Sequence, residues 1–120
     1  MIAHFKSIDK EGNLTEFDSI CEYKNNTYSF KDLATENTMI YITIDASTVT
    51  IKRLGNTNME IFLANGIKTS GYYKNNLGLE FNFYTLTTDL SINSGLLYAS
   101  YSLFMENDKI NEHKMWILFD

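Results

Sequence analysis

Residues 58–73 read NMEIFLANGIKTSGYY, and this stretch decides the fold class. On both sides of Asn65-Gly66 the chain follows the period of two that is typical of a strand with one buried face. Asn-Gly is a strong hairpin signal, because both positions tolerate the positive φ of a type I′ turn. The stretch therefore predicts antiparallel strands at residues 58–64 and 67–73, with Gly71 marking a bulge or a close backbone approach.

The same alternation continues in both directions from this stretch. Turn residues, chiefly Gly, Asn, Asp and Ser, separate the alternating segments at short intervals. We expect strands at residues 2–8, 14–23, 27–30, 38–45, 48–54, 58–64, 67–73, 79–92, 96–105 and 110–119. Because every connection is short, consecutive strands should pair antiparallel. The pattern predicts an all-β fold, a closed antiparallel meander barrel of about 8–10 strands.

Two segments need a separate interpretation. Residues 79–92 are too many for one straight strand, so we expect a bend near residues 85–89. Before the bend, three side chains are predicted to point inward: Leu79, Phe81 and Phe83. Residues 31–37 have room for at most one short helical turn.

The composition predicts one domain over residues 1–120 and excludes some classes of partner. Hydrophobic residues make up 44% of the chain, enough for one core. The net charge of −5 argues against binding to nucleic-acid phosphates. The nine lysines are scattered and form no basic cluster for an anionic membrane.

Few residues are of the kinds that carry catalysis or bind metals. Cys21 is the only cysteine and His4 and His113 are the only histidines, so we expect no disulfide, no metal and no cofactor. No nucleophile elbow or phosphate-binding loop is present, and we expect no catalytic residues. The first six residues lack an apolar signal core, and no apolar run approaches the roughly 18 residues of a membrane span. We therefore expect a cytoplasmic protein.

Arg53, the only arginine, falls on the apolar face of an alternating strand. An arginine on a buried face is costly unless it is paired. By the same parity, Tyr73, Tyr101 and His113 also point inward. These four side chains predict a ligand-binding site, in which Arg53 pairs with an anionic group and apolar residues hold an apolar tail. A small-molecule ligand is thus the expected partner.

The chain resembles the YwiB-like bacterial proteins, a family of unknown function with a lipocalin-like, calycin-type β-barrel. The resemblance covers nearly the whole chain, and its order and spacing carry it rather than any single motif. It rests on His4-x-Lys6-Ser7, Phe17, Val49-x-Ile51-x-Arg53-x-Gly55, Met59, Phe62, Tyr73, Gly78, Gly95, Tyr101 and His113-x-Met115-x-Ile117-x-Phe119. The chain departs from the family pattern in two places. The 55–62 segment is one residue shorter than in the family pattern, and the 78–90 segment is one residue longer. A shift of one residue moves side chains to the other face of a strand, so it affects whether Phe62 and Tyr84 point inward.

The resemblance implies a barrel in a bacterial cytoplasm and brings no substrate. It also adds a structural alternative for Arg53, since in calycin-type barrels an arginine often packs over a tryptophan near one end. Trp116 is the only tryptophan, although its parity places it on the face opposite to His113. Arg53 is then either a ligand group or a plug bonded to backbone carbonyls and stacked on an aromatic ring.

Two further functional hypotheses remain open. The outer face of the last two strands carries an apolar patch made of Tyr98, Phe104, Trp116 and Leu118, which predicts a protein-interaction surface and a homodimer. Either the 31–37 segment or another chain would cover it. In the other hypothesis, a hydrolase or isomerase uses His113 as a general base. That chemistry requires an orienting carboxylate and a neighbouring cavity.

Overall fold

The computed structural model describes all 120 residues and contains ten strands and no helix. The strands are β1 (Ile2–Asp9), β2 (Leu14–Lys24), β3 (Thr27–Lys31), β4 (Met39–Asp45), β5 (Thr48–Leu54), β6 (Asn58–Ala64), β7 (Lys68–Lys74), β8 (Glu80–Asn93), β9 (Leu96–Met105) and β10 (Asp108–Phe119). They agree with the ten segments expected from the alternation, within about two residues at most ends. With no helix at all, the chain has none that could cross a membrane.

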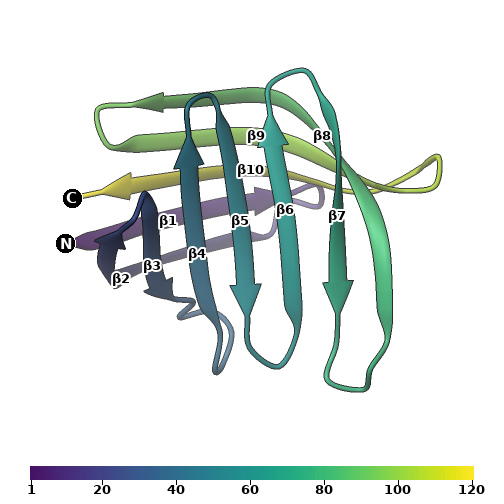
Figure 1. The fold of residues 1–120 in the computed structure, drawn as a ribbon, viewed down its shortest axis with the longest axis horizontal. Coiled ribbons are helices and arrows are strands. Elements are labelled where there is room, and N and C mark those ends of the chain that lie inside the picture. Colours follow the sequence, from purple (N-terminus) through teal and green to yellow (C-terminus); the bar gives the residue numbers. More distant parts are fainter.

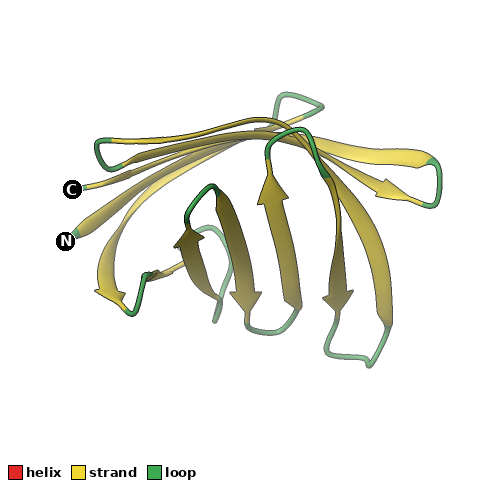
Figure 2. Cartoon of the chain, turned by 45° about the horizontal axis from the view of Figure 1, so that its top comes forward, coloured by secondary structure: helices red, strands yellow, loops and turns green.

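The ten strands close into one antiparallel barrel (Figure 1). Each strand pairs with its neighbours in the sequence, and β1 closes the sheet by pairing with both β2 and β10. The long strands β8, β9 and β10 arch across the shorter strands β4 to β7 (Figures 1 and 2). Closure leaves no long unpaired edge, which suits a chain without proline to protect one.

The barrel wall is apolar on its inner side. The inward positions of every strand except β7 supply one core of 17 buried hydrophobic residues. Phe5, Phe17 and Phe30 form an aromatic cluster in which the rings of Phe5 and Phe17 stack with centroids 4.9 Å apart. This cluster fills part of the lumen, and like the rest of the core it stabilises the fold by removing apolar area from water.

Two β-bulges bend the long strands. The register between β8 and β9 shifts at Thr88, and that between β9 and β10 shifts at Ile110. The Thr88 bulge confirms the bend expected near residues 85–89. A bulge adds one residue to a strand while its partner continues. The Thr88 bulge therefore lets β8 continue along β9 after the bend.

The expected helical turn in residues 31–37 does not form. The segment between β3 and β4 consists of turns. The Asp32 carboxylate accepts a hydrogen bond from the Ala34 backbone N–H at 2.9 Å and also pairs with Arg53. These local and long-range contacts satisfy the backbone without a helix, for which the segment is too short.

The hairpin at Asn65-Gly66 forms, but not with the expected turn geometry. Gly66 has a positive φ of 73° and Asn65 does not, so the turn is not type I′. Strands β6 and β7 pair at only three positions, between Asn58–Glu60 and Tyr72–Lys74. At Gly71 an added Cβ would lie 2.6 Å from the Glu60 carbonyl oxygen, so the glycine marks a close backbone approach.

Side chains near the start of β8 are more exposed than the alternation predicts. Phe83 is buried, whereas Leu79, which precedes β8, is 61% exposed and is not part of the core, so the inward prediction is wrong for Leu79. Phe81 shares the face of Phe83 and its ring stacks on Tyr73, but it is 39% exposed near the β7–β8 connection. Phe62 and Tyr84, for which the inward direction was open, are 40% and 44% exposed and lie on the outer side of the barrel wall.

Candidate functional site

A cavity of about 340 Å³ occupies part of the barrel lumen. It lies toward the end of the barrel that carries the β1–β2 and β5–β6 connections, because its lining includes residues next to both connections. The lining comprises Phe5, Ser7, Asp9, Asn13, Thr15, Ile40, Ile42, Ile51, Arg53, Met59, Ile61, Tyr101, Leu103, Asn111, His113 and Met115. Apolar walls with a few polar groups are typical of small-molecule sites, whose volumes begin at roughly 300 Å³.

Arg53 reaches this cavity from β5 and is held by an acid that the sequence analysis missed. Its Nη2 pairs with Oδ2 of Asp32, whose side chain is almost fully buried. Asp32 follows β3 directly, and β3 and β5 are separated in the sheet only by β4. The inward Arg53 predicts an acidic partner, but fifteen acids were available and no local pattern selects Asp32. The remaining N–H groups of Arg53 form no hydrogen bond within the protein.

Tyr101 contributes a buried hydroxyl to the same cavity. The residue is 7% exposed, and desolvation raises its pKa to about 12 despite the nearby Arg53 charge. The phenol is therefore protonated at neutral pH and can donate a hydrogen bond. It has no hydrogen-bond partner in the protein.

His113 lies beside Tyr101, with ring centroids 5.4 Å apart. Desolvation lowers the pKa of His113 below its usual value; Asp9, opposite it on β1, acts in the other direction, and Arg53 lowers the pKa further. The imidazole is thus neutral at pH 7, and Arg53 is the only cation in the lining.

The lowered pKa of His113 predicts that the protein becomes less stable as the pH falls below about 6.5. In that window the unfolded chain binds a proton at this histidine and the native state does not, so protonation favours unfolding. Asp9 and Glu112, whose pKa values are lowered by hydrogen bonds, lose their contribution only at more acidic pH. Chemical denaturation at pH 7.5, 6.5 and 5.5 should show this decline, and His113→Gln should make it shallower. An equal decline in both proteins would contradict the assignment.

The other predicted site residues lie elsewhere. Tyr73 is not part of the cavity lining, and its ring stacks on that of Phe81 with centroids 4.7 Å apart. His4 lies on the outer side of β1, where its Nδ1 is 2.6 Å from Oδ1 of Asp18. No group of three or more His, Cys, Asp or Glu side chains comes together in a way that could hold a metal ion.

The His113 environment bears on general-base chemistry. A cavity adjoins the ring, as that hypothesis requires, but the ring makes no hydrogen bond to a carboxylate or carbonyl. The nearest acid, Asp9, instead accepts hydrogen bonds from the backbone N–H groups of Glu11 and Asn13 and from the Asn13 side chain. The orienting partner that catalytic histidines use is therefore not formed.

A second hollow, of about 840 Å³, lies on the outer face of β8, β9, β10 and the end of β1. We call it the outer groove, and Tyr98, Phe104 and Trp116 line it. The Trp116 ring packs against Tyr98, and the Lys6 ammonium lies 5.4 Å from its centroid. Leu118, 41% exposed, is outside the groove. The 31–37 segment does not line it and lies around a different hollow.

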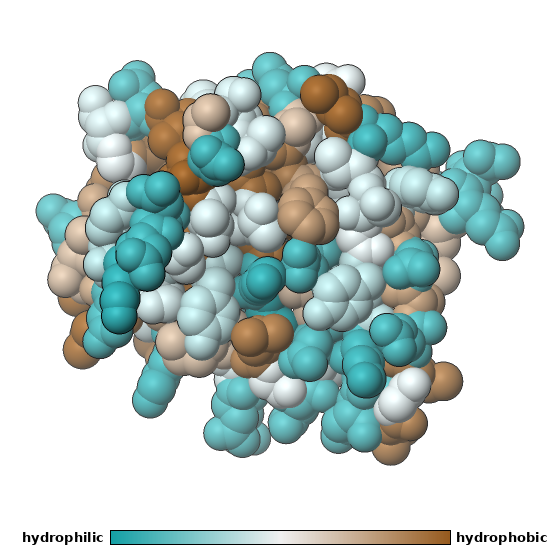
Figure 3. Space-filling model, in the orientation of Figure 1, coloured by the Kyte–Doolittle hydropathy of each residue, from teal (hydrophilic) through white to brown (hydrophobic).

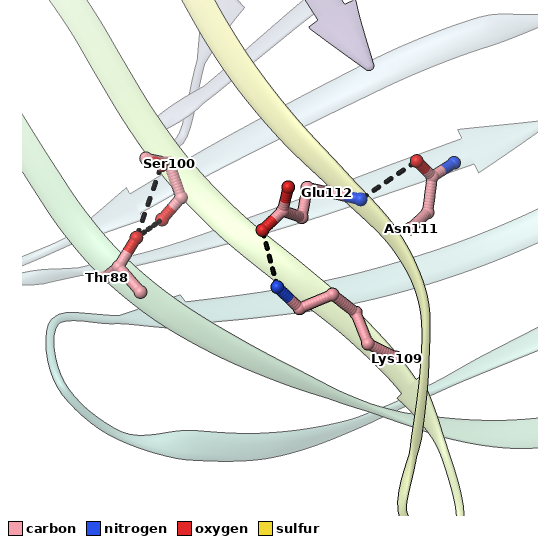
Figure 4. Close-up of polar contacts among 5 residues, drawn as sticks. All are labelled: Thr88, Ser100, Lys109, Asn111 and Glu112. Carbon is pink, nitrogen blue, oxygen red and sulfur yellow. Dashed lines mark hydrogen bonds and ion pairs between the residues drawn. The ribbon is translucent and has the colours of Figure 1, made fainter. Parts of the chain in front are cut away.

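Polar contacts join residues that line the outer groove (Figure 4). The Thr88 hydroxyl, at the bulge, donates to the Ser100 carbonyl oxygen at 3.0 Å. Lys109 Nζ donates to Glu112 Oε1 at 2.5 Å on β10. The lining of the outer groove therefore combines aromatic rings, lysines and hydroxyl groups. On the opposite side of the barrel, where β4 to β7 are in front, apolar side chains are interspersed with polar ones (Figure 3).

The fold and its cavity define a small antiparallel β-barrel with a partly open lumen. The chain belongs to the family described as a domain of unknown function (DUF1934), whose model matches residues 3–117. Its structure is similar to the crystal structure of the ywiB protein from Bacillus subtilis, with a TM-score of 0.65 and 18% sequence identity over 99% of this chain and 90% of that chain. The predicted YwiB-like resemblance is thus confirmed, and at this identity the structural likeness concerns the fold alone. No curated protein matches the chain.

Proposed function

We propose that this protein binds a small, partly apolar ligand with an anionic group in its barrel lumen, without catalysing a reaction. One observation carries the proposal: Arg53, Tyr101 and His113 line an apolar cavity, and their free donors have no acceptor in the protein. The Arg53 side chain is 38% exposed, so its free donors can be reached from the cavity. A ligand that supplies a charged acceptor there would form charge-assisted hydrogen bonds in partly desolvated surroundings. The Asp32 carboxylate holds Arg53 in place for this role.

Native mass spectrometry of the gently purified protein, followed by denaturing mass spectrometry, tests the proposal. A discrete extra mass that is lost on denaturation supports it, and Ser7→Phe, which fills the cavity, should abolish that mass. Ser70→Phe, on the exposed side of β7, is the matched control and should retain it. A mass that both variants keep would contradict binding in the lumen. So would a bare chain that also takes up no anionic, apolar dye such as anilinonaphthalene sulfonate.

The outer groove supports a second candidate function, that of a protein-interaction module or homodimer. Tyr98, Phe104 and Trp116 gather on one face, and no segment of the chain covers them. Large aromatic side chains in an open hollow are typical of interfaces, and a two-fold axis would let the groove of one copy meet that of another.

Under this second function, Trp116→Glu should convert a dimer into a folded monomer. The substitution removes the large ring that the partner copy would cover, and it places a carboxylate that must lose hydration on association. Lys6, opposite position 116 on β1, would offset only part of that cost. Sedimentation velocity measures the change, and Ile20→Glu, 79% exposed on β2, is the control that should stay dimeric. A wild-type protein that sediments as a monomer at high concentration would remove the homodimer from consideration.

A further inference from the structure

The charges that line the lumen cavity limit what it can bind. Only Arg53 and Asp9 are formally charged among its sixteen lining residues, and no lysine is present. Asp32 already balances part of the Arg53 charge. A dianion such as a phosphate monoester would bring a second negative charge toward Asp9 and Asp32 with no second cation to meet it. The cavity therefore fits a single negative charge.

The geometry of the donors indicates which anion carries that charge. Arg53 retains a guanidinium edge with unpaired N–H groups. Tyr101, a residue that is 7% exposed, adds a hydroxyl that has no partner and is accessible from the cavity. A planar carboxylate can accept two parallel bonds from a guanidinium and a third from a phenol. Asp32 already serves as the counter-ion of Arg53, so the head group has only to supply acceptors for the unpaired N–H groups and the phenol. A carboxylate, with two charged oxygens, accepts these bonds more strongly than the single oxygen of an alcohol does.

The remaining walls indicate the kind of tail. Nine lining residues are hydrophobic, and most are branched or flexible aliphatic chains: Ile40, Ile42, Ile51, Met59, Ile61, Leu103 and Met115. Since aliphatic side chains predominate over the rings of Phe5, Tyr101 and His113, the lining favours an aliphatic tail. At roughly 30 Å³ for each small group in a liquid, a cavity of about 340 Å³ accepts about eleven non-hydrogen atoms.

We propose that the lumen takes a medium-chain aliphatic monocarboxylate, with its carboxylate on Arg53 and Tyr101 and its tail among the isoleucines. This inference rests on the proposed function and narrows it to one ligand class. Octanoate, with about ten non-hydrogen atoms, matches the volume, whereas palmitate, with about eighteen, exceeds it.

Isothermal titration calorimetry at neutral pH with four probes tests the class. Octanoate should bind at least about tenfold more tightly than octanol or octyl phosphate, and palmitate should bind more weakly than octanoate. Octanol equal to octanoate would overturn the carboxylate and leave lumen binding standing. Tighter binding of octyl phosphate would overturn the single negative charge, and tighter binding of palmitate would overturn the size of the tail. Either result would leave lumen binding standing. If no probe binds but the native mass spectrum shows a co-purified ligand of another class, the monocarboxylate inference is overturned and the proposed function is not.

Variants locate the bound carboxylate. Tyr101→Phe should weaken octanoate about tenfold and leave octanol unchanged, because it removes only the hydroxyl. Tyr41→Phe removes a hydroxyl from the outer side of β4, next to the lining residues Ile40 and Ile42, and should change neither affinity. Thermal unfolding of each variant verifies that it is folded. An unchanged octanoate affinity in folded Tyr101→Phe would contradict the proposed pose.

Discussion

Replacing Arg53 with leucine should lower the free energy of unfolding by roughly 3 kcal/mol, because it leaves the Asp32 carboxylate buried without its cation. Removing one partner of a buried pair generally costs roughly 3–5 kcal/mol, and the lower end applies since the Arg53 side chain is itself 38% exposed. Denaturant unfolding monitored by circular dichroism or by Trp116 fluorescence measures the change.

A second replacement identifies the cause of that loss. In Arg53→Leu combined with Asp32→Asn, no charge is buried and the amide oxygen can still accept from the Ala34 N–H, so most of the stability should return. Lys52→Leu, at the residue just before Arg53, is the matched control. Its ion pair with Glu60, at 3.9 Å, is on the outer face and should contribute less than about 1 kcal/mol. If Arg53→Leu alone leaves stability unchanged, Asp32 does not depend on the arginine.

Ile42→Ala should lower the free energy of unfolding by roughly 2–5 kcal/mol while enlarging the lumen cavity. Ile42 is fully buried on β4 and forms part of the cavity wall. Truncation removes apolar contacts on the core side, and it adds room for about three more carbon atoms on the cavity side. The preferred carboxylate should therefore become longer, with decanoate gaining affinity relative to octanoate in the same titration.

The control for this prediction is Ile20→Ala on the outside of β2. Ile20 is 79% exposed, so its truncation should change stability by no more than about 0.5 kcal/mol and leave the length preference unaltered. A destabilised Ile42→Ala protein with the wild-type length preference would show that ligands do not extend to this part of the wall. A stability loss as small as that of the control would mean that Ile42 packs loosely against the cavity.

Local periodicity was sufficient to predict most of the barrel. A strand directs successive side chains to opposite faces, so the inward positions of Ile51, Arg53, Tyr101 and His113 follow from neighbouring residues alone. The bend at Thr88 followed from strand length. The prediction was wrong where tertiary packing decides exposure, as for Leu79 at the tip of the β7–β8 hairpin.

What the sequence by itself determined is the period of the strands, their approximate number and the face on which most side chains lie. The tertiary structure alone decided which inward groups meet: it brought Asp32 to Arg53 and grouped Tyr101 with His113, and it left Tyr73 stacked on Phe81 outside the cavity lining. The physical reason is that parity depends on the backbone within a few residues. Depth along the lumen depends instead on the register of every strand around a closed barrel.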